Sequence, residues 1–138
     1  MQPNPCYNTI LSPYQKWFVG NDARAIMLAD DSIVGQVGNN IYPLVAAENT
    51  VGDFIVYSRE RYGKSSVKMG VYEDECRLVV VAISDNYDQA IGLASKIDNA
   101  LSGQHIVHDG IKLSFILEDS TESYEDGKYI ETLMFQVK

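Results

Sequence analysis

The pattern of apolar positions predicts the strands of this chain. Residues 54–60 are rich in aromatic and β-branched side chains, which is typical of a strand. Residues 76–83 are apolar at nearly consecutive positions, so we expect a central strand whose two faces are both covered. Residues 111–117 and 129–137 place apolar side chains on one face, as strands beside a core do.

A second period, of three to four residues, predicts the main helix. Its apolar stripe consists of Tyr87, Ala90, Ile91, Ala94, Ile97 and Leu101. Ser84 and Asp85 can cap the start of this helix, and Gly103 ends it. We therefore expect one long amphipathic helix directly after the central strand.

The N-terminal part predicts an arm followed by a short helix. Residues 1–21 form the arm, which combines prolines with aromatic and aliphatic side chains. Such a segment packs on its own domain or on a neighbour. Asn21 or Asp22 can cap the short helix, which ends where Gly35 and Gly38 interrupt the helical spacing.

The connections between these elements are expected to be exposed. Residues 61–73 hold two glycines and several basic side chains, which is typical of a long connection or hairpin. Residues 118–127 are predicted to form an acidic turn. Residues 41–44 form a short extended piece, and 105–108 can pair with the strand at 111–117 through a tight turn.

Together these elements predict an α+β fold in a single domain at residues 22–138. We expect a four-stranded, mainly antiparallel sheet with the long helix packed on one face, plus the short N-terminal helix. A chain of 138 residues is about one domain's worth and can bury a core without cross-links. Cys6 and Cys76 are therefore expected to be free thiols in a reducing compartment.

Composition narrows the range of partners. The chain has 19 acidic and 11 basic residues and a net charge of −8, which disfavours nucleic acid and acidic lipid surfaces as main partners. The first residues do not resemble a secretory signal, and no apolar stretch approaches the roughly 20 residues that cross a bilayer. We expect a soluble protein that remains in the cytoplasm.

Two short motifs match those of serine penicillin-recognising enzymes. Ser65 to Lys68 match S-x-x-K, and Ser84 to Asn86 match S-D-N. The third motif, K-T-G, does not follow, and the chain is far too small for the two-lobed cleft of those enzymes. A loop serine and a helix cap are the preferred interpretation.

The sequence predicts neither a metal site nor a cofactor. His105, His108 and Asp109 are possible ligand types, but positions three apart on a strand face opposite sides. The acidic clusters at 73–75 and 118–126 lack the ligand spacing of a calcium loop. No glycine-rich phosphate motif is present, so we expect no cofactor and no enzymatic activity.

Nine tyrosines are the most unusual feature of the composition. Tyr7, Tyr14, Tyr62, Tyr72 and Tyr124 lie in the arm or in predicted connections. Tyrosine near arginine is typical of protein interfaces, because the ring contributes a large contact area and a polar tip. Local packing within the monomer explains the same residues almost equally well.

The order of elements and several short phrases resemble the tail-completion or tail-terminator family of long-tailed bacteriophages. The resemblance covers residues 22–138 as a pattern of elements, and the arm at 1–21 has no counterpart in it. The segments that carry it are Asn40-Ile41-Tyr42-Pro43, Phe54 to Glu60, Arg77 to Ile83, Tyr87-Asp88-Gln89-Ala90, Asn99-Ala100-Leu101, Gly110-Ile111, Tyr124 in the acidic loop, and Tyr129 to Val137.

Proteins of this family cap the tail tube and join the tail to the head. The resemblance implies a homo-oligomeric ring, commonly a hexamer, through which DNA passes without sequence-specific binding. It implies contacts with the major tail protein and with head–tail connector proteins, and no membrane partner. It places the protein in the host cytoplasm during assembly and then in the virion tail, whether the gene lies in a phage or a prophage.

The expected contact surface with a neighbouring subunit or tail protein follows from charge and aromatic content. It consists of Arg59, Arg61, Tyr62, Lys64, Lys68 and Tyr124. The acidic balance of the whole chain suits a lumen along which DNA slides without sticking.

A small-ligand or regulatory binding domain of unknown ligand is the alternative from another class. A helix packed on an antiparallel sheet can also form a pocket, and a deep apolar pocket in a monomer would favour this function. An enzyme ranks third, because no nucleophile, base and orienting group can be assembled from the motifs.

Overall fold

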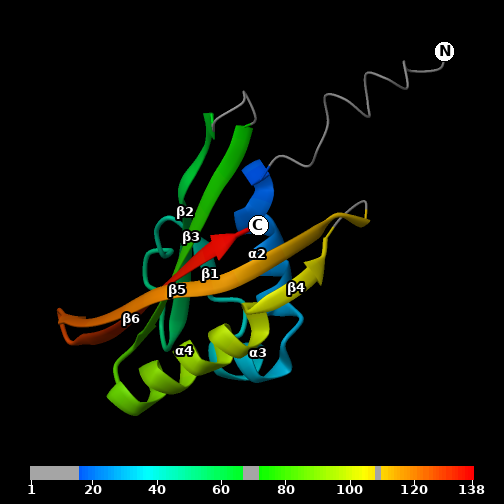
Figure 1. Cartoon of the computed structure of the whole chain (residues 1–138). Coiled ribbons are helices and arrows are strands. Elements are labelled where there is room, and N and C mark those ends of the chain that lie inside the picture. The colour runs from blue at the N-terminus through cyan, green and yellow to red at the C-terminus, as the bar shows by residue number, and fades with distance from the viewer. Residues whose placement is uncertain (1–15, 67–71, 108–109) are drawn as a thin grey trace.

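The computed structural model describes residues 16–66, 72–107 and 110–138, which form a curled sheet with helices against it (Figure 1). The elements are η1 (Lys16–Phe18), α2 (Val19–Leu28), α3 (Asp31–Val37), β1 (Ile41–Pro43), β2 (Phe54–Ser66), β3 (Tyr72–Ser84), α4 (Tyr87–Leu101), β4 (Gly103–Ile106), β5 (Lys112–Glu125) and β6 (Lys128–Val137). Cys6 and most of the predicted arm lie outside the described residues.

The sheet has six strands in the order β1-β2-β3-β6-β5-β4 and curls into a half-barrel. β1 pairs parallel with β2, whereas every other pair is antiparallel. The predicted four-stranded, mainly antiparallel sheet is therefore wrong. β1 lies in the predicted extended piece at 41–44, and β4 at Gly103–Ile106 pairs with β5 close to where a short strand at 105–108 was expected. The sequence did not predict that β1 pairs parallel with β2 or that both short strands belong to one sheet, because a segment of three or four residues shows no clear period.

Both long hairpins extend beyond the predicted strands. β2 continues to Ser66 and β3 starts at Tyr72, so most of the expected connection at 61–73 is strand. The expected acidic turn at 118–127 is also mostly strand, because β5 continues to Glu125 and the turn is reduced to Asp126 and Gly127. Both turn residues have positive φ, +50° and +78°, which suits the tight turn of a two-residue hairpin. Charged side chains did not end these strands because they lie on exposed surface.

Three helices replace the predicted two. The chain is helical from Val19 to Leu28, and the helix is interrupted at Asp30, whose backbone is extended. The Asp30 carboxylate caps α3 by accepting hydrogen bonds from the amides of Ser32 and Ile33. Gly38 ends α3 with a φ of +61°, as predicted, whereas Gly35 lies inside α3. The predicted caps Asn21 and Asp22 are wrong, because both lie inside α2. The Asp30 cap therefore divides into two helices a stretch that the spacing of apolar residues predicted as one helix.

The predicted long helix is present as α4 at Tyr87–Leu101. Its cap is Asn86, whose side chain accepts from the amide of Gln89 at 3.0 Å, rather than Ser84 or Asp85. Ala90, Leu93 and Ile97 of α4 are fully buried. The helix thus covers one face of the sheet, against β3 and β6.

The core lies between the helices and that face. Leu78, Val80 and Ala82 of β3 are fully buried there, together with Leu133 and Phe135 of β6. α2 closes the β2 side, where Gly20 allows close approach: a Cβ at this position would lie 3.0 Å from the Tyr57 ring. We call this side of the sheet the helix-covered face.

Candidate assembly surface

An aromatic and cationic cluster lies where the N-terminal segment meets β2. The guanidinium carbon of Arg59 is 4.6 Å from the centroid of the Trp17 ring, and Arg59 Nη1 donates to the Trp17 carbonyl oxygen at 3.1 Å. Tyr62 meets the same ring edge-on at 5.7 Å between centroids. Trp17 is nevertheless 57% exposed and the adjacent Phe18 is 58% exposed. This Trp17 cluster (Trp17, Phe18, Arg59 and Tyr62) has the composition of a protein interface.

A short ion pair fixes the segment that carries Trp17. Lys16 Nζ lies 2.6 Å from Asp74 Oδ2 on β3, and the two side chains are only 10% and 27% exposed. A charge-assisted bond of this kind is stronger than one in open solvent. The segment that carries Trp17 is therefore held against β2 and β3 within one molecule.

The other predicted basic residues of this region are placed differently. A bulge between Arg59 and Arg61 shifts the pairing with β3, so that Arg61 lies on the opposite face of the sheet from Arg59. Arg61 Nε is 3.1 Å from Glu75 Oε2, and both side chains are largely exposed. Lys64 lies in β2, where its backbone is opposite Asp74 of β3, and its side chain is not among the described ones. Lys68 lies outside the described residues.

Tyr124 does not join this group within one molecule. It lies near the turn of the β5–β6 hairpin, where its ring packs at 4.8 Å from Tyr129, which in turn lies 5.5 Å from Tyr87 of α4. The two hairpins extend from the sheet in different directions (Figure 1). The predicted surface is thus divided between the β2 side and the β5 side of the sheet.

The face opposite the helices carries an apolar surface that sequence reasoning missed. We call it the helix-free face and define its apolar part by Phe54, Val56, Val79, Val81, Ile83, Ile130 and Met134. These side chains alternate with the fully buried ones and are half-buried. The prediction that both faces of β3 are covered is therefore wrong for the described part of one molecule. The consecutive apolar run was the available signal for this face.

One end of the helix-free face is charged. Arg77 Nη1 lies 3.1 Å from Glu60 Oε1 and its Nη2 lies 2.9 Å from Glu118 Oε1. These hydrogen bonds and the two carboxylates raise the pKa of Arg77. The guanidinium thus bridges β2, β3 and β5 across the sheet.

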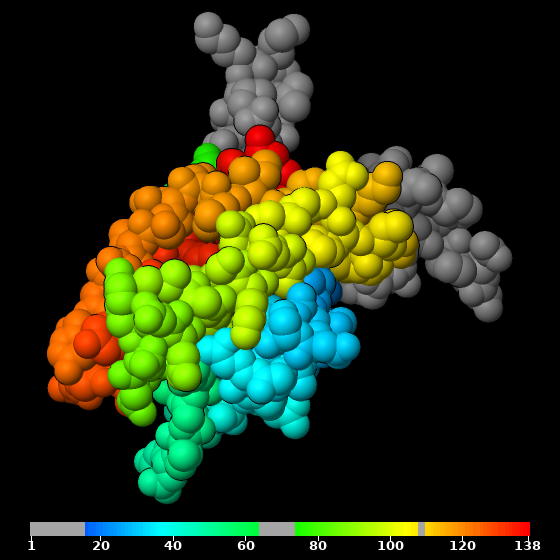
Figure 2. All heavy atoms as spheres, turned by 90° about the horizontal axis from the view of Figure 1, so that it is seen from below, coloured from blue at the N-terminus to red at the C-terminus, as the bar shows by residue number. Residues whose placement is uncertain are grey.

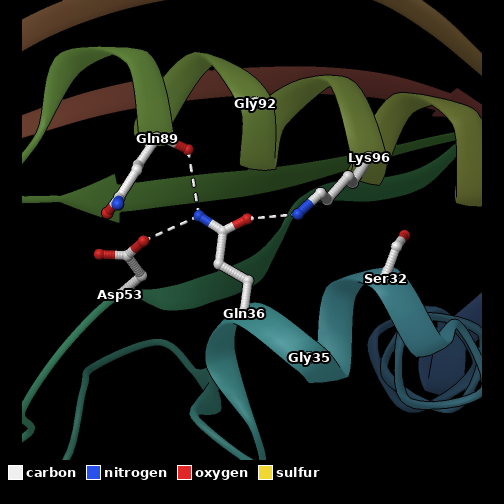
Figure 3. Close-up of a pocket in the computed structure, with 7 residues that line it drawn as sticks. All are labelled: Ser32, Gly35, Gln36, Asp53, Gln89, Gly92 and Lys96. Carbon is white, nitrogen blue, oxygen red and sulfur yellow. Dashed lines mark hydrogen bonds between the residues drawn. The ribbon is translucent and has the colours of Figure 1, made fainter.

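A polar groove of about 580 Å³ separates α3 from α4 (Figure 3). Gln36 Nε2 donates to Asp53 Oδ2 at 2.8 Å and to the Gln89 carbonyl oxygen at 3.1 Å, and Gln36 Oε1 accepts from Lys96 Nζ at 2.8 Å. Asp53 also accepts from Ser84, which is 1% exposed, at 2.7 Å. The groove is open to solvent, and its polar groups hold one another. It therefore works as a clamp between α3, α4 and the sheet.

A smaller groove of about 240 Å³ opens between α4 and the β5–β6 hairpin, and Figure 2 shows the cleft between the yellow-green helix and the orange strand. Glu131 lines it, opposite Glu122 in the strand pairing. Tyr87 donates from α4 to Glu122 at 3.1 Å, which raises the pKa of Tyr87. Burial and the neighbouring Glu122 raise the pKa of Glu131 to about 7.

The residues singled out for chemistry have structural partners. Ser84 bonds to Asp53 and to the amide of Asn86, and Asn86 caps α4. His105 Nε2 lies 2.8 Å from the Leu101 carbonyl oxygen, whereas His108 and Asp109 lie outside the described residues. Burial raises the pKa of the free Cys76 thiol to about 11, so that this thiol stays protonated at neutral pH.

Within residues 16–66, 72–107 and 110–138, no group of three or more His, Cys, Asp or Glu side chains comes together as a metal site. The helices in these ranges are too short or too polar to span a membrane.

Comparison with known proteins finds a likeness among solved structures. No protein-family model matches the sequence, and no curated protein matches it. Among solved structures, the fold is similar to a chain described as "Virion of native gene transfer agent (GTA) particle", with a TM-score of 0.65 and 18% identity. The likeness covers 86% of this chain and 92% of that chain. At this identity it shows a shared fold over nearly the whole length of both proteins.

Proposed function

We propose that the protein is a structural subunit of a phage-like virion. The observation that carries this proposal is the shared fold with a chain of a gene transfer agent virion, which extends over 92% of that chain. Two subunits with the same structural role in related particles would be expected to share their fold over nearly their whole length. The proposal assigns no catalytic activity to the chain.

More specifically, we propose a tail-completion or tail-terminator role. In this role copies form a ring at the end of the tail tube, contact the major tail protein and a head–tail connector, and let DNA pass. The sequence resemblance described above supports this finer assignment. In this role the protein would be located in the host cytoplasm during assembly and then in the virion tail.

Two surfaces of the molecule fit a protein that works in an assembly. The Trp17 cluster exposes two large aromatic rings, of which Trp17 is held by Arg59 next to the Lys16–Asp74 ion pair. The helix-free face leaves apolar side chains from three adjacent strands half-exposed. Contiguous apolar patches of this kind are typical of protein contacts rather than of a surface that stays in water.

A small-ligand binding domain remains the alternative function. The groove between α3 and α4 has a volume within the usual range of ligand pockets, which is roughly 300–1,000 Å³. Its polar groups are bonded to each other, however, and it is not lined by the apolar side chains that bury a ligand. We therefore favour the structural role.

Deletion of the gene from the genome that encodes it tests the role. The expected result is separate heads and tails in electron micrographs, with joined particles restored by the native chain supplied from a plasmid. Complementation by a Lys64→Glu, Lys68→Glu variant should be weaker, because both substitutions reverse charge at the predicted contact surface. Normal joined particles without the gene would contradict the proposal, as would a monomer isolated with a metabolite in its groove.

A further inference from the structure

β2 and β5, the strands next to the short outer strands β1 and β4, each leave a long edge without a partner in the described residues. β1 pairs with β2 only as far as Tyr57, and β4 pairs with β5 only as far as Phe115. Residues 58–66 of β2 and 116–125 of β5 therefore present unpaired backbone groups along their outer sides. We call these the β2 edge and the β5 edge. Unpaired edges of this length are templates for another strand.

The two edges match in length and differ in charge. The β2 edge has nine residues and the β5 edge has ten. Three basic side chains, Arg59, Arg61 and Lys64, stand against one acidic side chain on the β2 edge. The β5 edge carries four carboxylates and no basic side chain, at Glu118, Asp119, Glu122 and Glu125. Each edge would repel its own copy and attract the other edge.

We propose that copies of the chain join head to tail, with the β2 edge of one copy paired antiparallel to the β5 edge of the next. This inference rests on the proposed function, in which copies assemble. Within one sheet β2 and β5 run in opposite directions, so neighbouring copies of the same orientation meet as an antiparallel pair. A contact between two different surfaces can repeat around a closed ring.

The positions of the edges define how copies are arranged. Arg59 lies level with Leu117 across the sheet, and from this level the β2 edge and the β5 edge run toward opposite ends. If neighbouring copies were not displaced along the strand direction, the two edges would pair only over the few residues near this level. A displacement of each copy along the strands would bring more of both edges together. It would also tilt the strands relative to the ring axis, as stagger does in a closed barrel.

The pairing also explains two features of the single molecule. Tyr124 lies on the β5 edge and Arg59 and Arg61 lie on the β2 edge, so residues that are separate in one copy meet between copies. Ile116, which is 46% exposed, starts the β5 edge on the helix-free side, beside Gln136 and Arg77 at the charged end of that face. The pairing would therefore place a neighbouring copy beside an aliphatic side chain that one molecule leaves exposed.

Charge exchange between the edges tests the pairing in the full chain, with the mass in solution measured by light scattering. One variant carries Arg61→Glu and Lys64→Glu on the β2 edge, and another carries Asp119→Lys, Ser123→Lys and Glu125→Lys on the β5 edge. We expect each to associate at least tenfold more weakly than the native chain, and we expect the variant with all five substitutions to recover part of the loss. Melting curves show that each variant is folded.

A matched control reverses the same number of basic charges away from the free edges. Lys112→Glu with Lys138→Glu changes exposed lysines next to the part of β5 that β4 already covers. This control should keep the native mass. A control as weakly associated as the edge variants would overturn the pairing, because net charge would then explain the loss.

Amide hydrogen exchange reads the backbone pairing directly. In the assembled native chain, peptides covering 58–66 and 116–125 should become protected relative to the edge variants, because their amides gain partners. Unchanged exchange in both peptides, or a native chain that stays monomeric at about 100 µM, would overturn the pairing. Absence of the chain from purified particles would instead overturn the proposed function, so the two failures are distinguishable.

Discussion

The two faces of one strand show how a single apolar run serves two purposes. On β3, Leu78 and Val80 point to the helix-covered face and are fully buried, whereas Val79 and Val81 point to the helix-free face and are half-buried. The side chains are chemically alike. Their difference in burial comes from what lies opposite: α4 and α2 on one face, and no described element on the other.

This difference separates stability from assembly. The core side chains on the helix-covered face are buried when the monomer folds, so they supply its stability. Side chains on the helix-free face keep part of their surface for later burial. Substitutions on the two faces should therefore affect different measurements.

The largest effect is expected from Phe135→Ala on the helix-covered face. Phe135 is fully buried and its ring lies 6.5 Å from that of Phe115, so truncation leaves a cavity. We expect a loss of about 3–5 kcal/mol in the free energy of unfolding, measured by urea denaturation. The matched control is Met134→Ala, the next residue on the helix-free face, which should cost about 1 kcal/mol. Equal losses would show that both faces are covered in the monomer.

A smaller loss in the free energy of unfolding is expected when the hydrogen bonds that join α3, α4 and the start of β2 through Gln36 and Asp53 are broken. Asp53→Ala removes the acceptor of the Ser84 hydroxyl and of the Gln36 amide. As a donor, the buried Ser84 hydroxyl would then keep only its longer hydrogen bond to Gln89 Oε1, at 3.4 Å. We expect a loss of about 1–3 kcal/mol by the same measurement. Asp53→Asn, which keeps one acceptor oxygen, should cost less.

Glu131 makes the end of the helix-covered face sensitive to pH. Its pKa is raised to about 7 in the folded protein, above its ordinary value of 4.5. The folded state therefore favours the protonated form, so this contribution is complete below about pH 4.5 and is lost as pH rises through 7. The melting temperature of the native chain should fall across this window relative to Glu131→Gln. Parallel melting curves from pH 5 to 8 would exclude this contribution.

The smallest effect on stability is expected on the helix-free face. Val81→Thr replaces a half-buried methyl group with a hydroxyl that water can reach, so the free energy of unfolding should change by less than about 1 kcal/mol. The fully buried neighbour Val80→Thr should cost more, because its hydroxyl would be desolvated. If the helix-free face contacts other chains, Val81→Thr should also weaken association in light scattering. Unchanged association would leave this face outside the interface.

Sequence reasoning located the main elements but not the complete sheet. The strands at 54–60, 76–83 and 129–137 and the helix at 87–101 are present, because each carries enough apolar residues to show its period. β1 is too short to show one, and its parallel partner lies in another part of the chain. The exposed ends of both hairpins were missed because charged residues there resemble a loop.

The predicted contact residues had a different outcome. Arg59 and Tyr62 do lie together, but they do so around Trp17, which no local pattern linked to β2. Arg61 lies on the other face because a single bulge reverses its side. Whether these residues contact a neighbour stays a prediction.

By itself, the sequence determined where the main strands and the long helix lie and that β3 is apolar on both sides, because these properties depend on the order of side chains within a few residues. Tertiary structure alone decided that, among the described residues, helices cover only one of those sides and that two long edges of opposite charge have no partner strand. Those features depend on contacts between segments far apart in the chain, and no local pattern records which side of a strand its distant partners will occupy.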